Sequence, residues 1–248
     1  MDNSTHVSLS SATAMMRQLD VTANNIANAN TSGFKSERVV FESFVHRDTG
    51  REGEETSFVI DTGSYLDAAQ GQLQQTGNPL DVALSGTGWM SYETAEGQRA
   101  YGRDGQLMLD LQGNLVTSTG AQVLDAGGGP IALPPDIGAQ VTIARDGTIA
   151  ADGIGVIAQI GLFDLGDLQS FTRIGGGMFI PPQGAAQDAI PATGTAVVQG
   201  AVEGSNVQPV VELSRMMAIE KAYERSVKLM GGEDDLRRDA LRRLGQAV

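Results

Sequence analysis

Apolar residues recur at alternating steps of three and four near both ends of this chain of 248 residues. The first set consists of Leu9, Ala12, Met16, Leu19, Ala23 and Ile26. The second set consists of Leu213, Met216, Tyr223, Val227 and Met230, with the charged Glu220 as one interruption. This spacing places each set on one narrow helix face, which is the seam geometry of a coiled coil. Neither helix has a partner nearby in sequence, so we expect them to pair with each other or with copies of the same chain.

The N-terminal pattern predicts a helix over residues 8–28, capped by Ser8 or Ser10. Gly33 is available for a left-handed backbone after the end of this helix. Several asparagines and few charges make an isolated helix of this length marginal in water. We therefore expect the helix to become fully ordered only when it packs against its partner.

The C-terminal pattern predicts a second helix that begins at Pro209, a residue suited to the first helical turn. Ser205 and Gln208 have the spacing of a capping box just before it. The glycine pair that follows Met230 weakens the helical pattern, which resumes over residues 234–244. The two pieces are expected to join into one long helix once they are packed.

Short apolar runs fill the centre of the chain, and turn dipeptides such as Glu96-Gly97 and Asp146-Gly147 separate them. The runs cover residues 80–84, 89–92, 106–109, 114–117, 140–143 and 155–160. Closely spaced short strands with tight turns indicate antiparallel sheet, in a sandwich or an open barrel. The predicted fold is therefore mainly β with α-helical termini, in which an antiparallel β domain is inserted between two helices that pair as a coiled coil.

These patterns divide the chain into four regions. We expect a helix of an assembly domain over residues 1–35, a linker and extended segment over 36–80, the central antiparallel β domain over 81–200, and the C-terminal helix of the assembly domain over 201–248. Three smaller features are a strand over 38–45, a loop over 50–55, and irregular loop or edge strand over 175–195.

The negative charge is concentrated in the middle of the chain. Residues 51–200 carry 17 acidic and 5 basic side chains, while the whole chain has a net charge of −13. The near-neutral ends can therefore pack closely, and the acidic middle suits a solvated outer surface. Nucleic acid is not an expected partner, because phosphate binding needs a basic surface.

The first twenty residues show no pattern of a secretory signal. No stretch approaches the roughly 20 apolar residues of a membrane span. We therefore expect no membrane insertion, and any export should follow a route without a cleaved signal peptide.

The motifs point to no catalytic residue and no cofactor. The chain has no cysteine and two histidines, so we expect no metal site. The glycine triplets at 127–129 and 175–177 lack the Lys-Ser/Thr of a phosphate loop. The acidic residues leave one enzyme alternative, a carbohydrate-active β protein with helical oligomerisation arms and a carboxylate pair. Solvated strands and Asp-Gly turns account for the same residues without catalysis.

Three separated motifs carry a family resemblance. Residues 23–35 read ANNIANANTSGFK, residues 71–73 and 76–89 read GQL and TGNPLDVALSGTGW, and residues 203–207 read EGSNV, with Ala-Tyr-Glu later at 222–224. In this order they resemble the axial proteins of the bacterial flagellum, which form its rod and hook. The resemblance covers both ends and the centre of the chain up to about residue 125.

The resemblance implies a structural subunit of the flagellar basal-body rod. Such a subunit passes through the flagellar export apparatus and assembles in the periplasm with copies of itself and with other rod proteins. Its terminal helices would line a hollow tube as a coiled coil, its β domain would face outward, and the rod would transmit motor torque. The length and the stretch 240–245 favour the proximal rod, with a distal rod subunit as the alternative.

The helix stripes and the family motifs together select the residues expected at the assembly interface. They are Leu9, Ala12, Met16, Leu19, Ala23, Asn24, Asn25, Ile26, Asn28, Gly33, Phe34, Leu213, Met216, Met217, Tyr223, Val227 and Met230. We expect Asn24, Asn25 and Asn28 to bond between subunits and fix their register, as buried polar residues do in coiled coils. A fraying helix end is the alternative explanation of these asparagines. A buried amide without a partner costs about 1 to 3 kcal/mol, which would penalise misregistered stacking.

Overall fold

The chain is organised in two compact units, each built from segments that are distant in sequence. The computed structural model describes residues 2–47, 55–134, 137, 140–182 and 190–245. Unit 1 combines Met1–Ala27, Glu37–Asp67 and Gln208–Val248, and unit 2 combines Asn28–Ser36 with Ala68–Val207. The β-rich part of the chain is therefore inserted between helical ends, as predicted.

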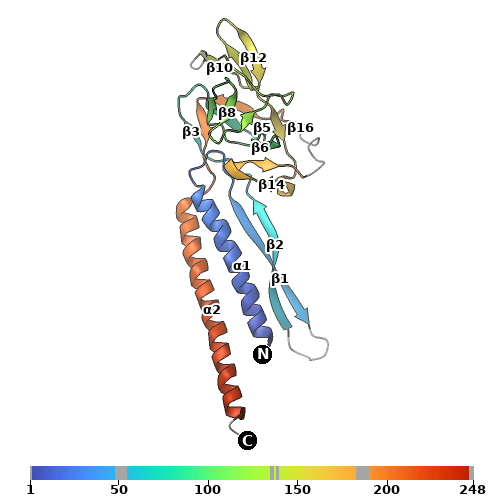
Figure 1. Cartoon of the computed structure of the whole chain (residues 1–248), viewed down its shortest axis with the longest axis vertical. Helices are drawn as coiled ribbons and strands as arrows, with labels where there is room; N and C mark the ends of the chain where they lie inside the picture. The colour runs from blue at the N-terminus through green and yellow to red at the C-terminus, as the bar shows by residue number, and fades with distance from the viewer. Residues whose placement is uncertain (1, 48–54, 135–136, 138–139, 183–189, 246–248) are drawn as a thin grey trace. The chain divides into compact units, whose positions relative to one another are not determined.

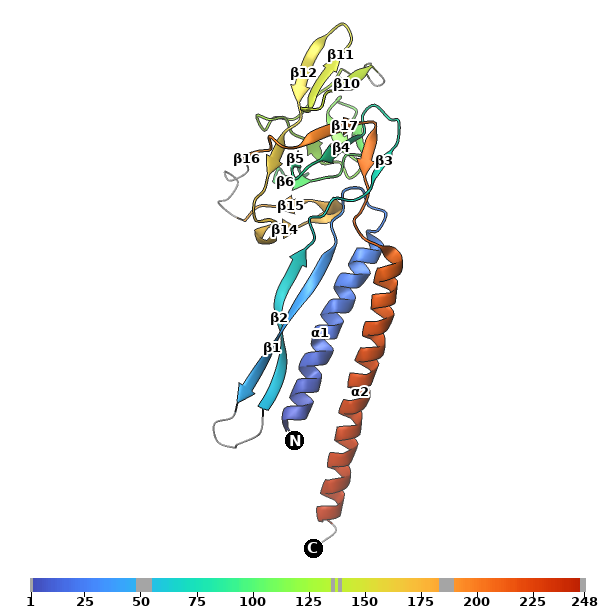
Figure 2. The same ribbon diagram turned by 180° about the vertical axis from the view of Figure 1, so that it is seen from behind.

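Unit 1 contains two helices and one antiparallel hairpin (Figure 1). Its elements are α1 (Asp2–Ala27), β1 (Glu37–Arg47), β2 (Glu55–Leu66) and α2 (Pro209–Gly245). Both views show α1 between the hairpin and α2, and the two helices run in opposite directions (Figures 1 and 2). The region expected as a linker over 36–80 thus contributes two long strands to unit 1. Most of the loop expected over 50–55 lies outside the described residues, and its last residue, Glu55, begins β2.

The start of α1 differs from the prediction, because the helix already begins at Asp2. Neither Ser8 nor Ser10 is therefore an N-cap. The hydroxyl of Ser10 donates to the carbonyl oxygen of Val7 at 2.9 Å, a bond to the helix's own preceding turn. The apolar repeat begins at Leu9, seven residues after the start of the helix, so it could not indicate where the first turn lies.

The second helix begins at Pro209 as predicted, and it continues through the glycine pair at 231–232 to Gly245. The predicted capping box is wrong. The Ser205 hydroxyl accepts a hydrogen bond from the amide of Val207 at 3.2 Å, which is a local turn two residues long. Glu212 stands in the first turn of α2, where a negative charge is favoured by the helix dipole.

Unit 2 is built of short strands, all paired antiparallel among the described residues. They are β3 (Leu73–Gln75), β4 (Val82–Ser85), β5 (Trp89–Glu93), β6 (Arg99–Gly102), β7 (Leu107–Leu109), β8 (Leu115–Thr117), β9 (Gln122–Val123), β10 (Val141–Ile143), β11 (Thr148–Ala151), β12 (Gly155–Gln159), β13 (Leu162–Asp164), β14 (Thr172–Arg173), β15 (Phe179–Ile180), β16 (Ile190–Pro191), β17 (Ala196–Gln199) and β18 (Ala201–Glu203). The largest sheet has the order β14-β15-β6-β5-β9-β8-β7, with β13 joined to β5. A second sheet, β10-β11-β12, ends in the hairpin labelled in Figure 2.

Each of the six apolar runs predicted from the sequence coincides with a strand, namely β4, β5, β7, β8, β10 and β12. Their inward side chains contribute to one core that includes Leu84, Met90, Tyr92 and Val141. The Asp-Gly and Glu-Gly turns also hold, since Gly97 and Gly147 adopt positive φ angles of 73° and 82°. Residues 175–195 contain a short 3-10 helix (Gly175–Gly177) with β15 and β16, and residues 183–189 of this range lie outside the described part.

Candidate assembly interface

The two terminal helices pack against each other within unit 1 (Figure 1). Ala12 of α1 is buried, as are Ile219 and Ser226 of α2. The Ser226 hydroxyl donates to the carbonyl oxygen of Ser8 at 3.1 Å. Together with the opposite helix directions, this contact fixes an antiparallel register in which Ser8 lies opposite Ser226.

The buried face of α2 coincides with only part of the predicted apolar stripe, because the other part lies one position further along the chain. Glu212, Ile219 and Ser226 are buried at intervals of seven residues. Met216, Tyr223 and Met230 of the predicted set are partly buried beside them, whereas Leu213 and Val227 are exposed, as is Met217.

The first helix shows the same division. Ala12 is buried and Leu19 and Ile26 are partly buried, whereas Leu9 and Met16 are 55% and 53% exposed. Ala23 is exposed as well. Because Leu9, Met16 and Ala23 are seven residues apart, they form one row on a side of α1 that α2 does not cover.

Asn25 contributes to the structure of its own chain. It is 1% exposed, and its side-chain amide donates to the carbonyl oxygen of Glu37 at 2.8 Å. The amide of Glu37 donates in return to Asn25 Oδ1 at 3.0 Å. The side chain therefore connects α1 to the first residue of β1. Its hydrogen bonds within the chain explain the burial of Asn25 without a contact between subunits. Asn24 is exposed, and Asn28 Oδ1 accepts a hydrogen bond from the Thr31 hydroxyl at 3.2 Å.

Three charged residues form a buried ion cluster in unit 2. Glu203 Oε1 lies 2.5 Å from Lys35 Nζ, and Glu203 Oε2 lies 3.0 Å from Arg103 Nη1. The side chains of Lys35 and Glu203 are completely buried. The amide of Gly71 donates to Glu203 Oε1 at 2.9 Å, and Lys35 donates to the carbonyl of Ala69 at 2.8 Å. Lys35, Gly71 and Glu203 belong to three different family motifs, so these motifs meet at one carboxylate.

Backbone bonds beside this cluster join the segment after α1 to the segment before α2. Gly33 N donates to Glu203 O at 2.7 Å, and Asn206 N donates to Phe34 O at 3.3 Å. The amide of Ser36 donates to Asn206 Oδ1 at 2.7 Å. We call this pairing of residues 32–36 with 203–206 the clamp. It holds together two points of the chain that are about 170 residues apart.

Gly33 and Phe34, both predicted at the assembly interface, lie inside unit 2 at the clamp. The φ angle of Gly33 is 67°, and a Cβ atom there would lie 2.3 Å from the carbonyl carbon of Arg103. Only glycine avoids both the backbone strain and this clash. Phe34 is 3% exposed, with the Arg173 guanidinium 4.2 Å from its ring centroid. Arg173 also donates to the carbonyl of Lys35.

The sequence reasoning missed the roles of Lys35, Arg103 and Glu203. Lys35 is the last residue of the first motif and Glu203 is the first residue of the third. Residues 23–35 and 203–207 each contain one charged residue, and the two charges are opposite. This was the signal in the sequence that could have indicated the pair. No such signal marks Arg103, because it follows the short strand β6 and lies outside the three family motifs.

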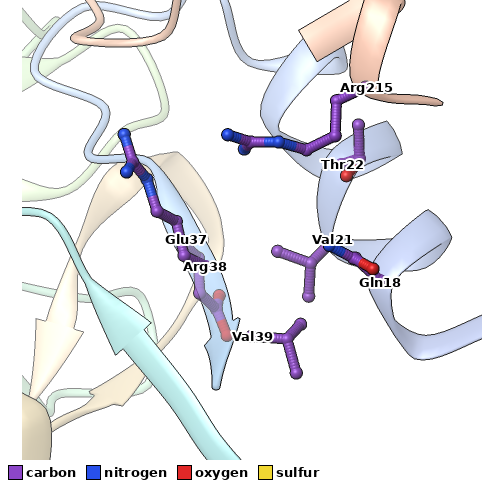
Figure 3. A pocket seen from close by; sticks show the side chains of 7 residues that line it. All are labelled: Gln18, Val21, Thr22, Glu37, Arg38, Val39 and Arg215. Carbon is purple, nitrogen blue, oxygen red and sulfur yellow. The ribbon is translucent and has the colours of Figure 1, made fainter. Parts of the chain in front are cut away.

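A small cavity of about 170 Å³ lies in unit 1 where α1, β1 and α2 come together (Figure 3). It is lined by Gln18, Val21, Thr22, Glu37, Arg38, Val39 and Arg215. Arg215 is paired with Glu212 at 2.8 Å, and Arg38 lies 3.8 Å from Asp67. The cavity is smaller than the roughly 300–1,000 Å³ of typical small-molecule sites.

The described residues contain no group of three or more His, Cys, Asp or Glu side chains that could hold a metal ion. Among the helices of the described part, none has the length and apolarity needed to cross a membrane.

Three segments of the chain match known protein families. Residues 7–35 match the flagella basal body rod protein, residues 83–151 the flagellar hook protein FlgE/F/G D1 domain, and residues 198–243 the flagellar basal body rod FlgEFG protein C-terminal. Together with terminal helices that pack against each other and a β-rich region between them in sequence, these matches define the class of flagellar rod and hook proteins.

Relatives that span the whole chain narrow this class. The chain is 39% identical to the flagellar basal-body rod protein FlgF of Caulobacter vibrioides and 35% identical to FlgF of Mesorhizobium japonicum. Each alignment covers 99% of this chain and 99% of the relative. Identity to FlgG of Agrobacterium fabrum is 30%, over 90% of this chain and 92% of that protein. The chain belongs to the family of flagellar basal-body rod proteins, and within it is most like FlgF.

Proposed function

We propose that this protein is a structural subunit of the flagellar basal-body rod, located in its proximal part. The observation that carries the proposal is the pair of terminal helices with apolar rows left exposed in a single copy, in a chain similar to FlgF along its full length. Large exposed apolar residues in a row mark a surface that is covered by another molecule.

Polymerisation proceeds through α1 and α2, which pair as a coiled coil. The seven-residue spacing of Glu212, Ile219 and Ser226 supports this pairing, because a heptad interval keeps one face toward the partner helix. The exposed half of the stripe, with Leu9, Met16, Leu213 and Val227, is then left for neighbouring subunits. The acidic side chains of the central region keep that part of each subunit in solvent.

The role in the rod is mechanical and needs no catalysis. Torque must pass through each subunit without the helical pair separating from the β-rich part of the chain. The clamp supports this role, since it ties the two helix-flanking segments together through buried charges and backbone bonds. The partners in this proposal are copies of the chain, other rod proteins, and the flagellar export apparatus that moves the subunit to the periplasm without cleaving a signal.

The second candidate is a distal rod subunit of the FlgG type. The 30% identity to FlgG of Agrobacterium fabrum favours it, over most of both chains. The higher identity to FlgF proteins favours the proximal position.

Deletion of the gene in its own bacterium, followed by complementation with an epitope-tagged copy, tests the proposal. We expect non-swimming cells without a complete rod, rescue by the tagged copy, and antibody label at the inner part of purified basal bodies. Label at the outer part of the rod would support the FlgG alternative. Normal swimming of the deletion strain, or absence of the tag from purified basal bodies, would overturn the structural role.

A further inference from the structure

The last segment of unit 2 in sequence provides pairing partners for two other strands of this unit. Unit 2 ends at Val207, and residues 196–206 just before its end carry β17 and β18. We call residues 196–206 the closing segment. Within the part of the chain that the structure describes, β17 alone pairs with β4 (Figure 2), and β18 alone pairs with β3. Until the closing segment is in place, β3 and β4 therefore lack their pairing partners.

The closing segment also contributes to the core. Val197 is 2% exposed and belongs to the core of unit 2. Backbone bonds fix the turn between β17 and β18, because the amide of Gly200 donates to the carbonyl oxygen of Asp81 at 2.8 Å and the amide of Thr76 donates to that of Gly200 at 2.9 Å. Without this segment, unit 2 therefore loses part of its core together with several backbone bonds.

The buried ion cluster depends on the closing segment as well. Glu203 lies 2.5 Å from Lys35 Nζ and 3.0 Å from Arg103 Nη1, and the side chains of both cations are at most 2% exposed. Moving a charged group out of water is strongly unfavourable unless an opposite charge accompanies it. A chain in which Glu203 has not reached this place therefore keeps Lys35 and Arg103 in water, and its clamp stays open.

The order of the chain makes the closing segment the last part of unit 2 to become available. A chain is released from the ribosome beginning with its N-terminus, so residues 28–36 and strands β3 to β16 all precede this segment. The bond between Ser36 and Asn206 joins residues 170 positions apart. Contacts between such distant residues carry an entropic cost of loop closure that local contacts do not. Helix α2, against which α1 packs, follows later still.

We infer that the closing segment controls when unit 2 folds. Without residues 196–206 the rest of unit 2 has no stable structure, so a growing chain stays unfolded there until this segment has emerged. Docking of the closing segment is then the rate-limiting step of folding. The use of this delay rests on the proposed function, because late folding helps a subunit that must enter an export apparatus.

The competing order of events is early folding of the largest sheet. Its strands β5 to β9 are neighbours in sequence, and local pairing of this kind forms quickly. The closing segment would then dock after the rate-limiting step, on a sheet that already exists. Burial of Arg103 opposes this order. Arg103 directly follows β6, and its guanidinium lies 5.1 Å from the ring centroid of Trp89 in β5, so the sheet carries a buried cation that Glu203 neutralises.

Refolding and unfolding rates of the full chain distinguish the two orders. Val197→Ala shortens a core side chain of the closing segment without changing any charge. We expect this variant to refold about tenfold more slowly than wild type and to unfold within about twofold of the wild-type rate, because a contact made in the rate-limiting step affects folding and not unfolding. Stopped-flow urea jumps in both directions measure the rates. The fluorescence of Trp89, the only tryptophan, provides the signal from unit 2.

Val198→Ala is the matched control, since it makes the same change at the next residue of β17, whose side chain is 39% exposed. Both of its rates should stay within about twofold of wild type. Two outcomes overturn the inference: a Val197→Ala variant that refolds at the wild-type rate and unfolds about tenfold faster, or equal slowing of refolding by the control. Each leaves the rod function standing, whereas absence of the wild-type chain from purified basal bodies removes the rod function and leaves the order of folding measurable.

Discussion

At the scale of single residues, the structure depends on a few charges that are buried and paired. Glu203 joins Lys35, Arg103 and the amide of Gly71 with no exposed side-chain surface. A buried ion pair gains little over an apolar core of the same shape, but removing one partner leaves an uncompensated charge. Burial of Lys35 and Arg103 is therefore favourable only when the segment that carries Glu203 is in place. The ion cluster thus couples formation of the clamp to the pairing of these charges.

Replacing Glu203 by Gln should lower the free energy of unfolding of unit 2 by about 3–5 kcal/mol, because two buried cations lose their counter-charge. Trp89 is the only tryptophan and is buried in unit 2, so its fluorescence in a urea titration reports this change. Glu96→Gln makes the same chemical change on an exposed turn and should alter the free energy by less than about 0.5 kcal/mol. Equal stability of the two variants would contradict the role of the cluster.

Asp104 gives a prediction that depends on pH. Burial raises the pKa of its carboxyl group, an effect opposed by the hydrogen bond from the Gln106 amide and by Ser32, and the negative charge of Asp81 adds to the rise. A raised folded-state pKa means that the folded protein binds this proton more tightly than the unfolded chain does. Stability is therefore lost as the pH rises through the folded pKa, and the ionised carboxylate is a net cost at neutral pH.

Asp104→Asn should consequently raise the free energy of unfolding at pH 7, since the amide keeps an acceptor for Gln106 and carries no charge. The difference from wild type should shrink as the pH falls toward 4, near the ordinary pKa of about 3.9 for Asp. Urea titrations of both proteins at the two pH values measure it. A variant that is less stable at pH 7, or an advantage that grows toward low pH, would show that the charge is compensated.

At the scale of elements, the apolar pattern was a reliable guide to type and a poorer guide to which face is used. All six predicted strands exist, because a short apolar run between turn residues has few alternatives. The helix stripes were half right for a physical reason. A spacing of three and four marks every apolar side of a helix alike, whether its own chain or another copy covers it. The buried residues Glu212 and Ser226 of α2 are polar and could not be found by an apolar pattern.

The glycine pair in α2 makes an element-scale prediction. Gly231 is exposed within a continuous helix, and a Cβ atom there would meet nothing within 4 Å. Gly231→Ala should raise the free energy of unfolding of unit 1 by about 1 kcal/mol, because glycine is that much worse than alanine in a helix interior. Circular dichroism at 222 nm during thermal unfolding measures this. Ala218→Gly, on an exposed position of the same helix, should produce a loss of similar size, and a destabilised Gly231→Ala variant would contradict both expectations.

At the scale of the whole molecule, the sequence indicated the insertion of a β region between helices but could not show how segments combine into units. The strand predicted over residues 38–45 is β1, but the sequence did not indicate that it pairs with β2 or that this hairpin belongs with the helices in unit 1. Unit 2 recruits residues 28–36 from the far side of that hairpin. Both arrangements depend on contacts between distant residues, such as Asn25 with Glu37 and Lys35 with Glu203, which local patterns do not encode.

Two truncations separate folding of unit 2 from rod assembly. Removal of residues 208–248 deletes α2 but keeps the clamp and the ion cluster, so unit 2 should still unfold cooperatively in urea, as followed by Trp89 fluorescence. Removal of residues 201–248 also takes Glu203 and β18, leaves Lys35 and Arg103 buried without a counter-ion, and should yield an unfolded chain. In cells, neither truncation should enter the rod, because both lack the helix that α1 packs against. If the shorter deletion is already unfolded, or if it restores swimming, then α2 is not the separable assembly element that the division into two units requires.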